Sequence, residues 1–409
     1  LPVGMAYTNL GLTDNLSAEI FYQYEYQNTV SDACGTFFST SDIAAEGCNT
    51  LAVRGGTFSI SRDDSAVEEP SDDGQFGIAL RYFVESIETE FGLYGMTIHS
   101  RAPIYNVVAD NSNDFTTALK VAPADTLYLG QPAGQFAPFY AFVPGGIATA
   151  VTGGRIADTR YAISYPEDNK LVGLSFSTNL AGMAVSGEVS HKIDSPVQIN
   201  GPLLTNAALA RGYADPSNAA QAAAYKEIYG SANTTSPTSV SPGQIDGFRL
   251  FDITQVQATL INTFSNVAGA SQVAIVGEVG GQYVHDFDDV LRYGRASFFG
   301  NPTFAADEDK DGFVTESSFG YRARLSATYN NVFAGVDMIP VVSWSHDVSG
   351  TSAGPGGPFL EGNQSLGLSV KAKYLERYSA SLAYTAYEGG DYSITGDRDF
   401  VSASVDVQF

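Results

Sequence analysis

LSAEIFYQYEYQN, residues 16–28, alternates apolar or aromatic side chains with polar ones along almost its whole length. The same period of two recurs in SFGYRARLSATY (318–329), SLGLSVKAKY (365–374) and VSASVDVQF (401–409). This alternation predicts β-strands that have one apolar and one polar face. At about ten residues, the strands are nearly twice the usual globular length and match tilted strands that cross a bilayer.

A soluble β-sandwich also alternates, so the composition of the two faces decides the class. The polar face carries full charges in mid-strand, such as Arg322 and Lys371, which suits a water-filled lumen. The apolar face is rich in Tyr and Ala, with aromatic residues toward strand ends, as in the girdles of membrane barrels. Short and long connections alternate strictly along the chain. The sequence therefore predicts an all-β fold, an antiparallel transmembrane β-barrel with short periplasmic turns and long extracellular loops.

We expect residues 1–409 to form a single outer-membrane barrel domain. An even strand number, as in bacterial barrels, requires one strand between residues 100 and 155, and residues 3–10 are a further candidate. The total is about 14 strands, or 16. The other strands are expected at 16–28, 75–84, 90–99, 156–165, 170–178, 183–192, 250–263, 272–284, 317–329, 334–346, 364–375, 378–388 and 399–409. The extracellular loops are expected at about 29–74, 100–117, 193–249, 285–316, 347–363 and 389–398.

The charge balance excludes some partners. Asp and Glu number 45 against 21 Lys and Arg, which gives a net charge of -24, although only 16% of all residues are charged. An acidic surface disfavours nucleic acid, whose phosphates require Lys and Arg. The longest uncharged stretch, 126–154, is interrupted by Pro and Gly and predicts no transmembrane helix. No targeting signal is visible at Leu1.

The two cysteines, Cys34 and Cys48, lie in a polar stretch typical of a loop. We expect them to form a loop-closing disulfide. In the chain-entropy description, closing a loop of this size stabilises the fold by roughly 3 kcal/mol. A disulfide indicates an oxidising location: the periplasm, the outer membrane or the cell exterior.

Six stretches of the chain are distinctive as a set: LPVGMAYTNLGLTDNLS (1–17), CGTFFS (34–39), YPEDNKLVGLSFST (165–178), DGFVT (311–315), WSHDV (344–348) and GDRDFVSASV (396–405). Together they resemble a proteobacterial outer-membrane β-barrel family of unknown function, whose members are large, porin-like proteins. The resemblance runs from Leu1 to Phe409. It implies an outer-membrane barrel and an association with genes that handle lipids, steroids or other hydrophobic compounds. It implies no catalytic residues.

The chain departs from this family at its start. Members carry a signal peptide and a further segment before the equivalent of Leu1. Without that segment the barrel as written would be incomplete, and processing would explain its absence equally well.

DEDKDGFVT, residues 307–315, matches the first nine positions of a calcium-binding loop. Gly312 would allow its sharp turn, but Ser318 replaces the usual bidentate glutamate and no helices flank the loop. Two interpretations therefore remain: a weak extracellular Ca²⁺ site that fixes the loop, or a solvated acidic loop tip without a metal. The candidate ligands are Asp307, Asp309, Asp311, the carbonyl of Phe313, and Thr315.

We expect Asp309→Ala to abolish Ca²⁺ binding, because the substitution removes one of three converging carboxylates. Titration calorimetry of the wild-type protein and the variant measures the effect. If the wild-type protein showed no heat of Ca²⁺ binding, the calcium hypothesis would be rejected.

Charged residues on the expected lumenal register suggest a basic ladder opposite acidic residues. Such a ladder would attract anions. The alternative is ordinary lumenal polarity with internal ion pairs. The candidate lumen residues are Arg81, Arg322, Arg324, Lys371, Lys373, Glu19 and Glu25.

Two loop segments are candidates for controlling access. The apolar run QFAPFYAFV (135–143) would either fold into the bore as a constriction, through Phe136, Phe139, Tyr140 and Phe142, or pack on its own rim. Residues 215–230 predict a helix with Asp215 as N-cap, Pro216 at its first position and Gly230 beyond its end. That helix would either close the mouth as a lid or merely order its loop.

Enzymatic chemistry is not expected. The four histidines, His99, His191, His285 and His346, fall near the outer ends of strands that are not neighbours, so we interpret them as rim residues and not as a metal ring. His285-Asp286 and His346-Asp347 are adjacent pairs, and neighbours on a strand point to opposite faces. No nucleophile motif, phosphate-binding loop or dinucleotide fingerprint occurs.

The sequence thus predicts a bacterial outer-membrane, porin-like channel for passive or gated passage of small, hydrophobic or amphipathic solutes. The alternative is a structural or adhesive surface barrel whose acidic, calcium-stapled loops mediate assembly. The expected partners are the lipid bilayer, lipopolysaccharide and a small-molecule solute, with no nucleic acid. A homo-oligomer would follow only by analogy with trimeric porins.

Overall fold

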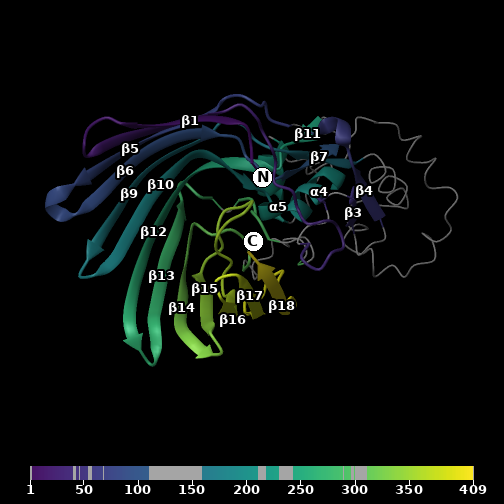
Figure 1. Ribbon diagram of the computed structural model, residues 1–409. Coiled ribbons are helices and arrows are strands. Elements are labelled where there is room, and N and C mark those ends of the chain that lie inside the picture. Colours follow the sequence, from purple (N-terminus) through teal and green to yellow (C-terminus); the bar gives the residue numbers. More distant parts are fainter. Residues whose placement is uncertain are drawn as a thin grey trace, which may run out of the picture.

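In the computed structural model, the described residues form two β-sheets and two α-helices (Figure 1). It describes residues 2–39, 43–45, 47–53, 58–67, 69–109, 159–210, 218–229, 243–288, 290–295, 299 and 311–408. Among these, no helix is long and apolar enough to span a membrane.

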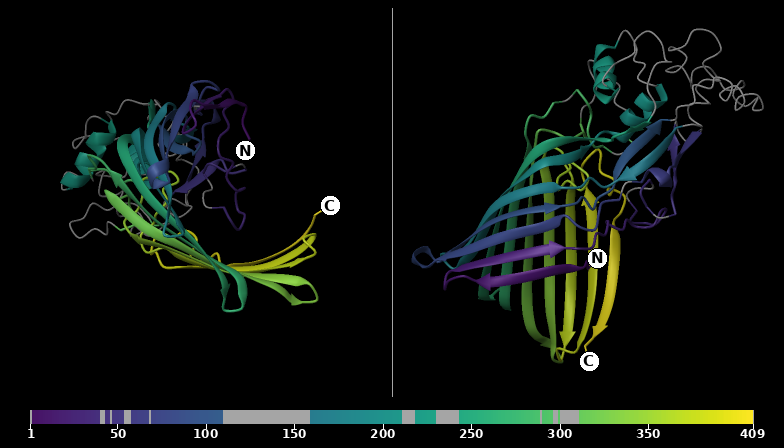
Figure 2. Two further views of the ribbon diagram at one scale, coloured as in Figure 1. Left: turned by 60° about the vertical axis from the view of Figure 1, so that its left-hand side comes forward. Right: turned by 90° about the horizontal axis from the view of Figure 1, so that it is seen from above.

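The larger sheet contains 13 strands, each antiparallel to its neighbours, and it is strongly curved (Figure 2). Its strands follow in chain order, with β1 and β18 as the outermost two. This arrangement confirms the antiparallel all-β prediction. The strands are β1 (Met5–Gly11), β2 (Leu16–Gln23), β5 (Gln75–Val84), β6 (Thr89–Ile98), β9 (Asn169–Leu180), β10 (Met183–Gln198), β12 (Phe248–Val267), β13 (Ala270–Val284), β14 (Ser317–Phe333), β15 (Val336–Ser349), β16 (Gln364–Tyr374), β17 (Tyr378–Glu388) and β18 (Phe400–Val407).

Tight turns join these strands at one end of the sheet, where short connections were predicted. Ala181-Gly182, Ala268-Gly269 and Ala334-Gly335 form two-residue connections in which both residues have positive φ. Such turns match the right-handed twist of the flanking strands. The long connections lie at the opposite end, which we call the loop end.

One predicted strand is assigned wrongly. Residues 156–165 were expected in the barrel sheet, but Arg160–Ser164 forms β8 of the smaller sheet. Residues 161–164 are all buried, so neither face of this strand is exposed as a lipid-facing side would be. The candidate at residues 3–10 is confirmed as β1. Of the segment 100–155, residues 104–109 form β7 in the smaller sheet, and residues 110–155 lie outside the described residues.

The smaller sheet has the order β11-β7-β8-β4-β3 and lies with the helices beyond the loop end (Figures 1 and 2). Its members are β3 (Thr50–Val53), β4 (Phe58–Arg62), β7 (Ile104–Ala109), β8 and β11 (Gly243–Ile245), accompanied by α4 (Gly201–Ala210), α5 (Ala219–Tyr229) and the short 3₁₀ turn η1 (Asp64–Ala66). A second 3₁₀ turn, η2 (Glu85–Ile87), joins β5 to β6.

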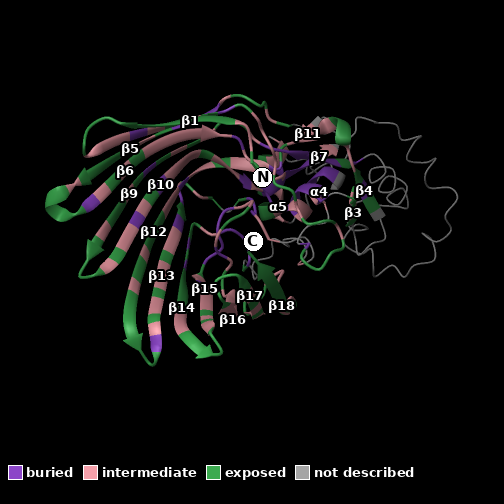
Figure 3. Ribbon diagram, viewed as in Figure 1, coloured by how far each residue is buried: buried purple, intermediate pink, exposed green. Residues whose placement is uncertain are grey.

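These elements share a compact apolar core, seen as the concentration of buried residues in Figure 3. Tyr105, Ile199 and Leu204 are buried in it. Burial raises the pKa of Tyr105, whose hydroxyl lies 2.7 Å from that of Thr205. We call this unit, formed by β3, β4, β7, β8, β11, α4 and α5, the cap.

The helix predicted at 215–230 is present as α5, but its described part begins later. The Asn218 side chain accepts a hydrogen bond from the Gln221 backbone amide at 2.9 Å, so Asn218 caps this helix in place of Asp215. Asparagine is as good a cap as aspartate, because its side-chain oxygen satisfies the same free amide.

Candidate functional site

The two faces of the large sheet differ sharply in chemistry. Cross-strand partners at one level are all apolar or glycine: Leu93, Leu174, Val189, Val256, Gly281 and Phe319. A second row, shifted by one residue along each strand, lies on the opposite face. Its members are polar or glycine: Ser17, Arg81, Gly92, Ser175, Glu188, Gln257, Gly280 and Gly320. A shift of one residue exchanges the faces because side chains alternate along a strand. We call these the outer and the inner face.

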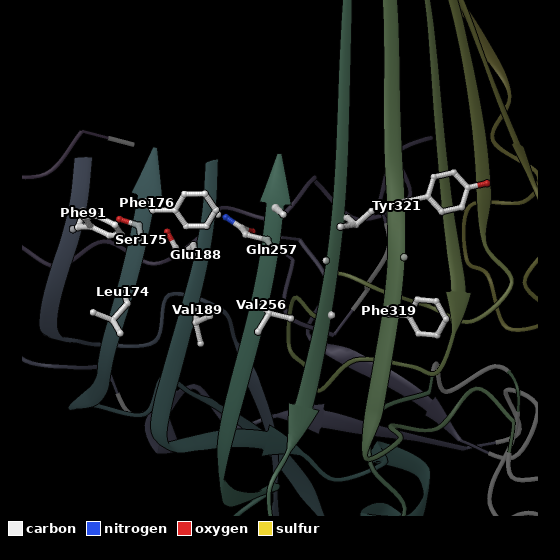
Figure 4. Close-up of a pocket in the computed structure, with 17 residues that line it drawn as sticks. Phe91, Leu174, Ser175, Phe176, Glu188, Val189, Val256, Gln257, Phe319 and Tyr321 are labelled. Carbon is white, nitrogen blue, oxygen red and sulfur yellow. The ribbon is translucent and has the colours of Figure 1, made fainter. Parts of the chain in front are cut away.

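Most of the large apolar side chains on the outer face are exposed. Leu174 and Val279, for example, are 60% and 58% accessible. Leu174, Val189 and Val256 lie on successive strands, as Figure 4 shows. Here the face forms a shallow apolar groove of about 770 Å³. An apolar surface of this extent is typical of a membrane or protein contact.

The candidate lumen residues lie on the inner face in separate groups. Arg81 contacts Glu19 at 3.3 Å and Glu90 at 3.7 Å. Glu25 lies just beyond β2, where it accepts a hydrogen bond from the Gly4 amide at 2.6 Å. Five strands lie between β5 and β14, so this first group is remote from the remaining candidates.

The other four basic candidates lie on β14 and β16, on either side of β15. Arg322 faces Glu278 across the strands and approaches Asp347 to 3.5 Å. Lys373 pairs in register with Asp337, whereas Arg324 and Lys371 pair with Ser343 and Ser381. The structure thus places the predicted basic residues on two distant parts of the inner face, and each of these parts also contains acidic residues.

The most prominent feature of the inner face is a loop whose position was not predicted. Residues 350–362, which we call the inward loop, fold back from the loop end onto β13 and β14. Phe359 lies against the sheet where Gly280 and Gly320 leave room: a Cβ at Gly320 would lie 2.9 Å from its ring. The Arg322 side chain donates a hydrogen bond to the Pro358 carbonyl at 3.1 Å.

The inward loop is also fixed at its other end. The Ala353 amide donates to Oε1 of Gln282 at 2.8 Å, and the Gln198 amide donates to the Gly354 carbonyl at 2.9 Å. Its sequence, GTSAGPGGPFLEG, carries the Gly and Pro content of a tightly folded loop. That composition is the one signal that pointed to its compactness. Its position on the inner face depends on contacts with residues distant in sequence.

A second groove occupies the inner face of β2, β5, β6, β9 and β10. Its volume is about 590 Å³. The lining combines the charged side chains of Arg81, Glu90 and Glu188 with apolar ones. The apolar lining includes Phe21, Tyr94, Met96 and Leu171. This mixture would suit an amphipathic molecule better than a simple ion.

The predicted disulfide is present between Cys34 and Cys48. Its loop contacts the start of the last strand: the rings of Phe38 and Phe400 lie 5.5 Å apart, and Arg398 donates to the Ser39 carbonyl at 2.6 Å. The disulfide-closed loop therefore connects the N-terminal and C-terminal parts of the large sheet at the loop end.

The calcium hypothesis stays a prediction. Asp307 and Asp309 lie outside the described residues, and Gly312 has the positive φ of 79° that the predicted turn requires. The Thr315 hydroxyl donates to the Ser317 carbonyl at 2.8 Å, and the Arg295 guanidinium lies over the Phe313 ring. In the described part of the chain, no three His, Cys, Asp or Glu side chains converge as metal ligands.

The candidate constriction, Phe136, Phe139, Tyr140 and Phe142, lies entirely outside the described residues. Two of the histidines show an arrangement that the sequence did not reveal. His191 on β10 and His285, directly after β13, reach across β12, and their rings lie 5.4 Å apart. The Thr254 hydroxyl lies between them, 3.0 Å from Nδ1 of His191 and 2.7 Å from Nε2 of His285.

Over residues 1–409 the chain matches the family described as "Protein of unknown function (DUF1302)". No curated protein sequence matches it. Among solved structures, it is similar to in-vitro folded OmpT, an outer membrane protein of Vibrio cholerae, at 8% identity and a TM-score of 0.28, over 98% of this chain and 83% of that one. It is also similar to a Pseudomonas aeruginosa FadL homologue, at 7% identity and a TM-score of 0.32, over 98% of this chain and 75% of that one.

Proposed function

We propose that this chain, which belongs to the DUF1302 family of proteins of unknown function, is an outer-membrane β-barrel channel for small amphipathic or hydrophobic solutes. Passage would be passive and would need neither cofactor nor catalysis. The surrounding bilayer and lipopolysaccharide would cover the outer face, and solutes would move along the inner face.

The observation that carries this proposal is the inward loop. Phe359 rests on Gly280 and Gly320 of the inner face, beside the charged pair Arg322 and Asp347. Phe359 is only 5% accessible, so it holds the inward loop on the sheet, and the loop thereby narrows a polar passage. A barrel that only displayed its loops would not require one of them to fold back onto its inner face.

We expect Phe359→Ala to raise the single-channel conductance in planar lipid bilayers, because it removes the buried side chain that holds the inward loop against the sheet. Phe319→Ala is the matched control. Phe319 precedes Gly320 on β14 but lies on the outer face and is 51% accessible, so its removal should leave the conductance unchanged.

Equal conductance in the wild-type protein and Phe359→Ala would show that the inward loop does not limit passage. A correctly folded protein that never conducts would instead favour the structural or adhesive barrel. In that case the acidic loops would bind a partner or a second copy of the chain. Heat-modifiable gel mobility verifies folding in each preparation.

A further inference from the structure

A small, partly open cavity lies between the inward loop and the inner face of β10, β12 and β13. Its volume is about 220 Å³. The strands contribute Lys192, Ser195, Gln255 and Gln282, and the roof is formed by residues 353–358. Because this roof is hydrogen-bonded to both Gln198 and Gln282, the cavity is built into the fold.

Lys192 gives this cavity a positive charge without a compensating acid. Among the described residues, no ion pair joins the partly buried Lys192 ammonium group to a carboxylate. The nearby Arg322, by contrast, has Asp347 at 3.5 Å and Glu278 opposite. A partly buried charge is costly unless it is paired, so an anionic group would be favoured here.

The other polar groups of the cavity are hydrogen-bonding and uncharged. Gln282 is only 6% accessible, and its Oε1 is occupied by the Ala353 amide, while Gln255 and Ser195 offer an amide and a hydroxyl. One ammonium with neutral donors matches a single negative charge. A phosphate monoester, with up to two charges, would leave an excess buried in the cavity.

Next to Lys192, a row of apolar residues and one glycine runs across the inner face. Lys192 pairs in register with Leu171, Leu171 with Met96, and Met96 with Gly77. Gly77 pairs with Phe21, whose ring fills the space that a Cβ at Gly77 would need. From β10 to β2 this row spans four strand spacings, or about 19 Å.

Leu171, Met96 and Phe21 also line the 590 Å³ groove, so the cavity and the groove are adjacent on one face. A charged end and an elongated apolar row thus lie side by side. Within the proposed channel, on which this step rests, we infer that Lys192 binds the carboxylate of a medium-chain amphiphile whose hydrocarbon tail lies along Leu171, Met96 and Phe21.

The experiment measures equilibrium binding of labelled octanoate to the full chain in lipid nanodiscs at pH 8, with empty nanodiscs subtracted. We expect saturable binding by the wild-type protein. Lys192→Met should weaken it about ten- to hundredfold, because it removes a charge-assisted hydrogen bond while keeping the aliphatic stem. Lys192→Arg should retain most of it. Lys371→Met is the matched control, since Lys371 is an inner-face lysine outside the cavity.

Leu171→Gln tests the contribution of the tail row. This variant should bind octanoate more weakly than the wild-type protein does, whereas the affinity of acetate, measured by competition with labelled octanoate, should be the same for both proteins. Equal affinity in the wild-type protein and Lys192→Met, or equal binding of octylammonium, would overturn the inference. Tighter binding of octyl phosphate than of octanoate would overturn the choice of a carboxylate. Because binding is measured without current, a protein that binds octanoate but never conducts would contradict only the proposed channel.

Discussion

Val256→Arg is expected to destabilise the folded protein in lipid vesicles by about 2–4 kcal/mol, because an arginine in mid-strand on a lipid-facing surface must leave water. Val256 is 47% accessible and lies in the apolar row with Val189 and Gly281. Denaturant titration in vesicles, followed by heat-modifiable gel mobility, measures the free energy of unfolding.

Gln257→Arg provides a control one residue away. Gln257 lies on the inner face and pairs in register with Glu188, which would partly neutralise the new guanidinium. We therefore expect less than about 1 kcal/mol for this substitution. If Gln257→Arg were the more destabilising of the two, the assignment of the outer and inner faces would be reversed. Equal small effects would contradict a lipid-covered outer face.

Leu204→Ala is expected to destabilise the cap by about 2–5 kcal/mol, because it leaves a cavity in a packed core. Leu204 is fully buried in α4, in the same core as Tyr105, Ile199 and Tyr225. Hydrogen exchange of the backbone amides of β7 and α4 reports this local stability, since exchange there requires the cap to open.

The control for this experiment is Lys226→Ala on α5. Lys226 is exposed, and a surface substitution of this kind changes stability by less than about 0.5 kcal/mol. Unchanged amide protection of β7 in Leu204→Ala would show that the cap does not depend on this core. Loss of protection in Lys226→Ala would show that α5 is held by its surface.

Most of the strands could be predicted because their pattern is local. The alternation in 16–28 and 318–329 identifies β2 and β14 from neighbouring residues alone, although the turn at Ala334-Gly335 lies inside the strand expected at 334–346. The error at residues 156–165 has the same origin. A short apolar strand has the same local sequence pattern in a membrane sheet and in a compact cap. The two locations are distinguished only by strand pairing, here that of β8 with β7 and β4.

The candidate site was predicted only in part. The sequence placed Arg81 and Arg322 on the polar face, but five strands lie between them and divide the predicted basic ladder. Phe359 and Lys192 were missed because neither belongs to a motif. Their importance arises from Gly320 beneath the ring and from the inward loop above the ammonium group.

The sequence by itself determined that this chain forms long antiparallel strands with one apolar and one polar face, because alternation has a period of two residues and needs no distant partner. Only the tertiary structure decided which residues share a level across the sheet, such as Lys192, Leu171 and Met96. Register between strands and the folding of the inward loop depend on hydrogen bonds between residues far apart in the chain, and no local pattern encodes them.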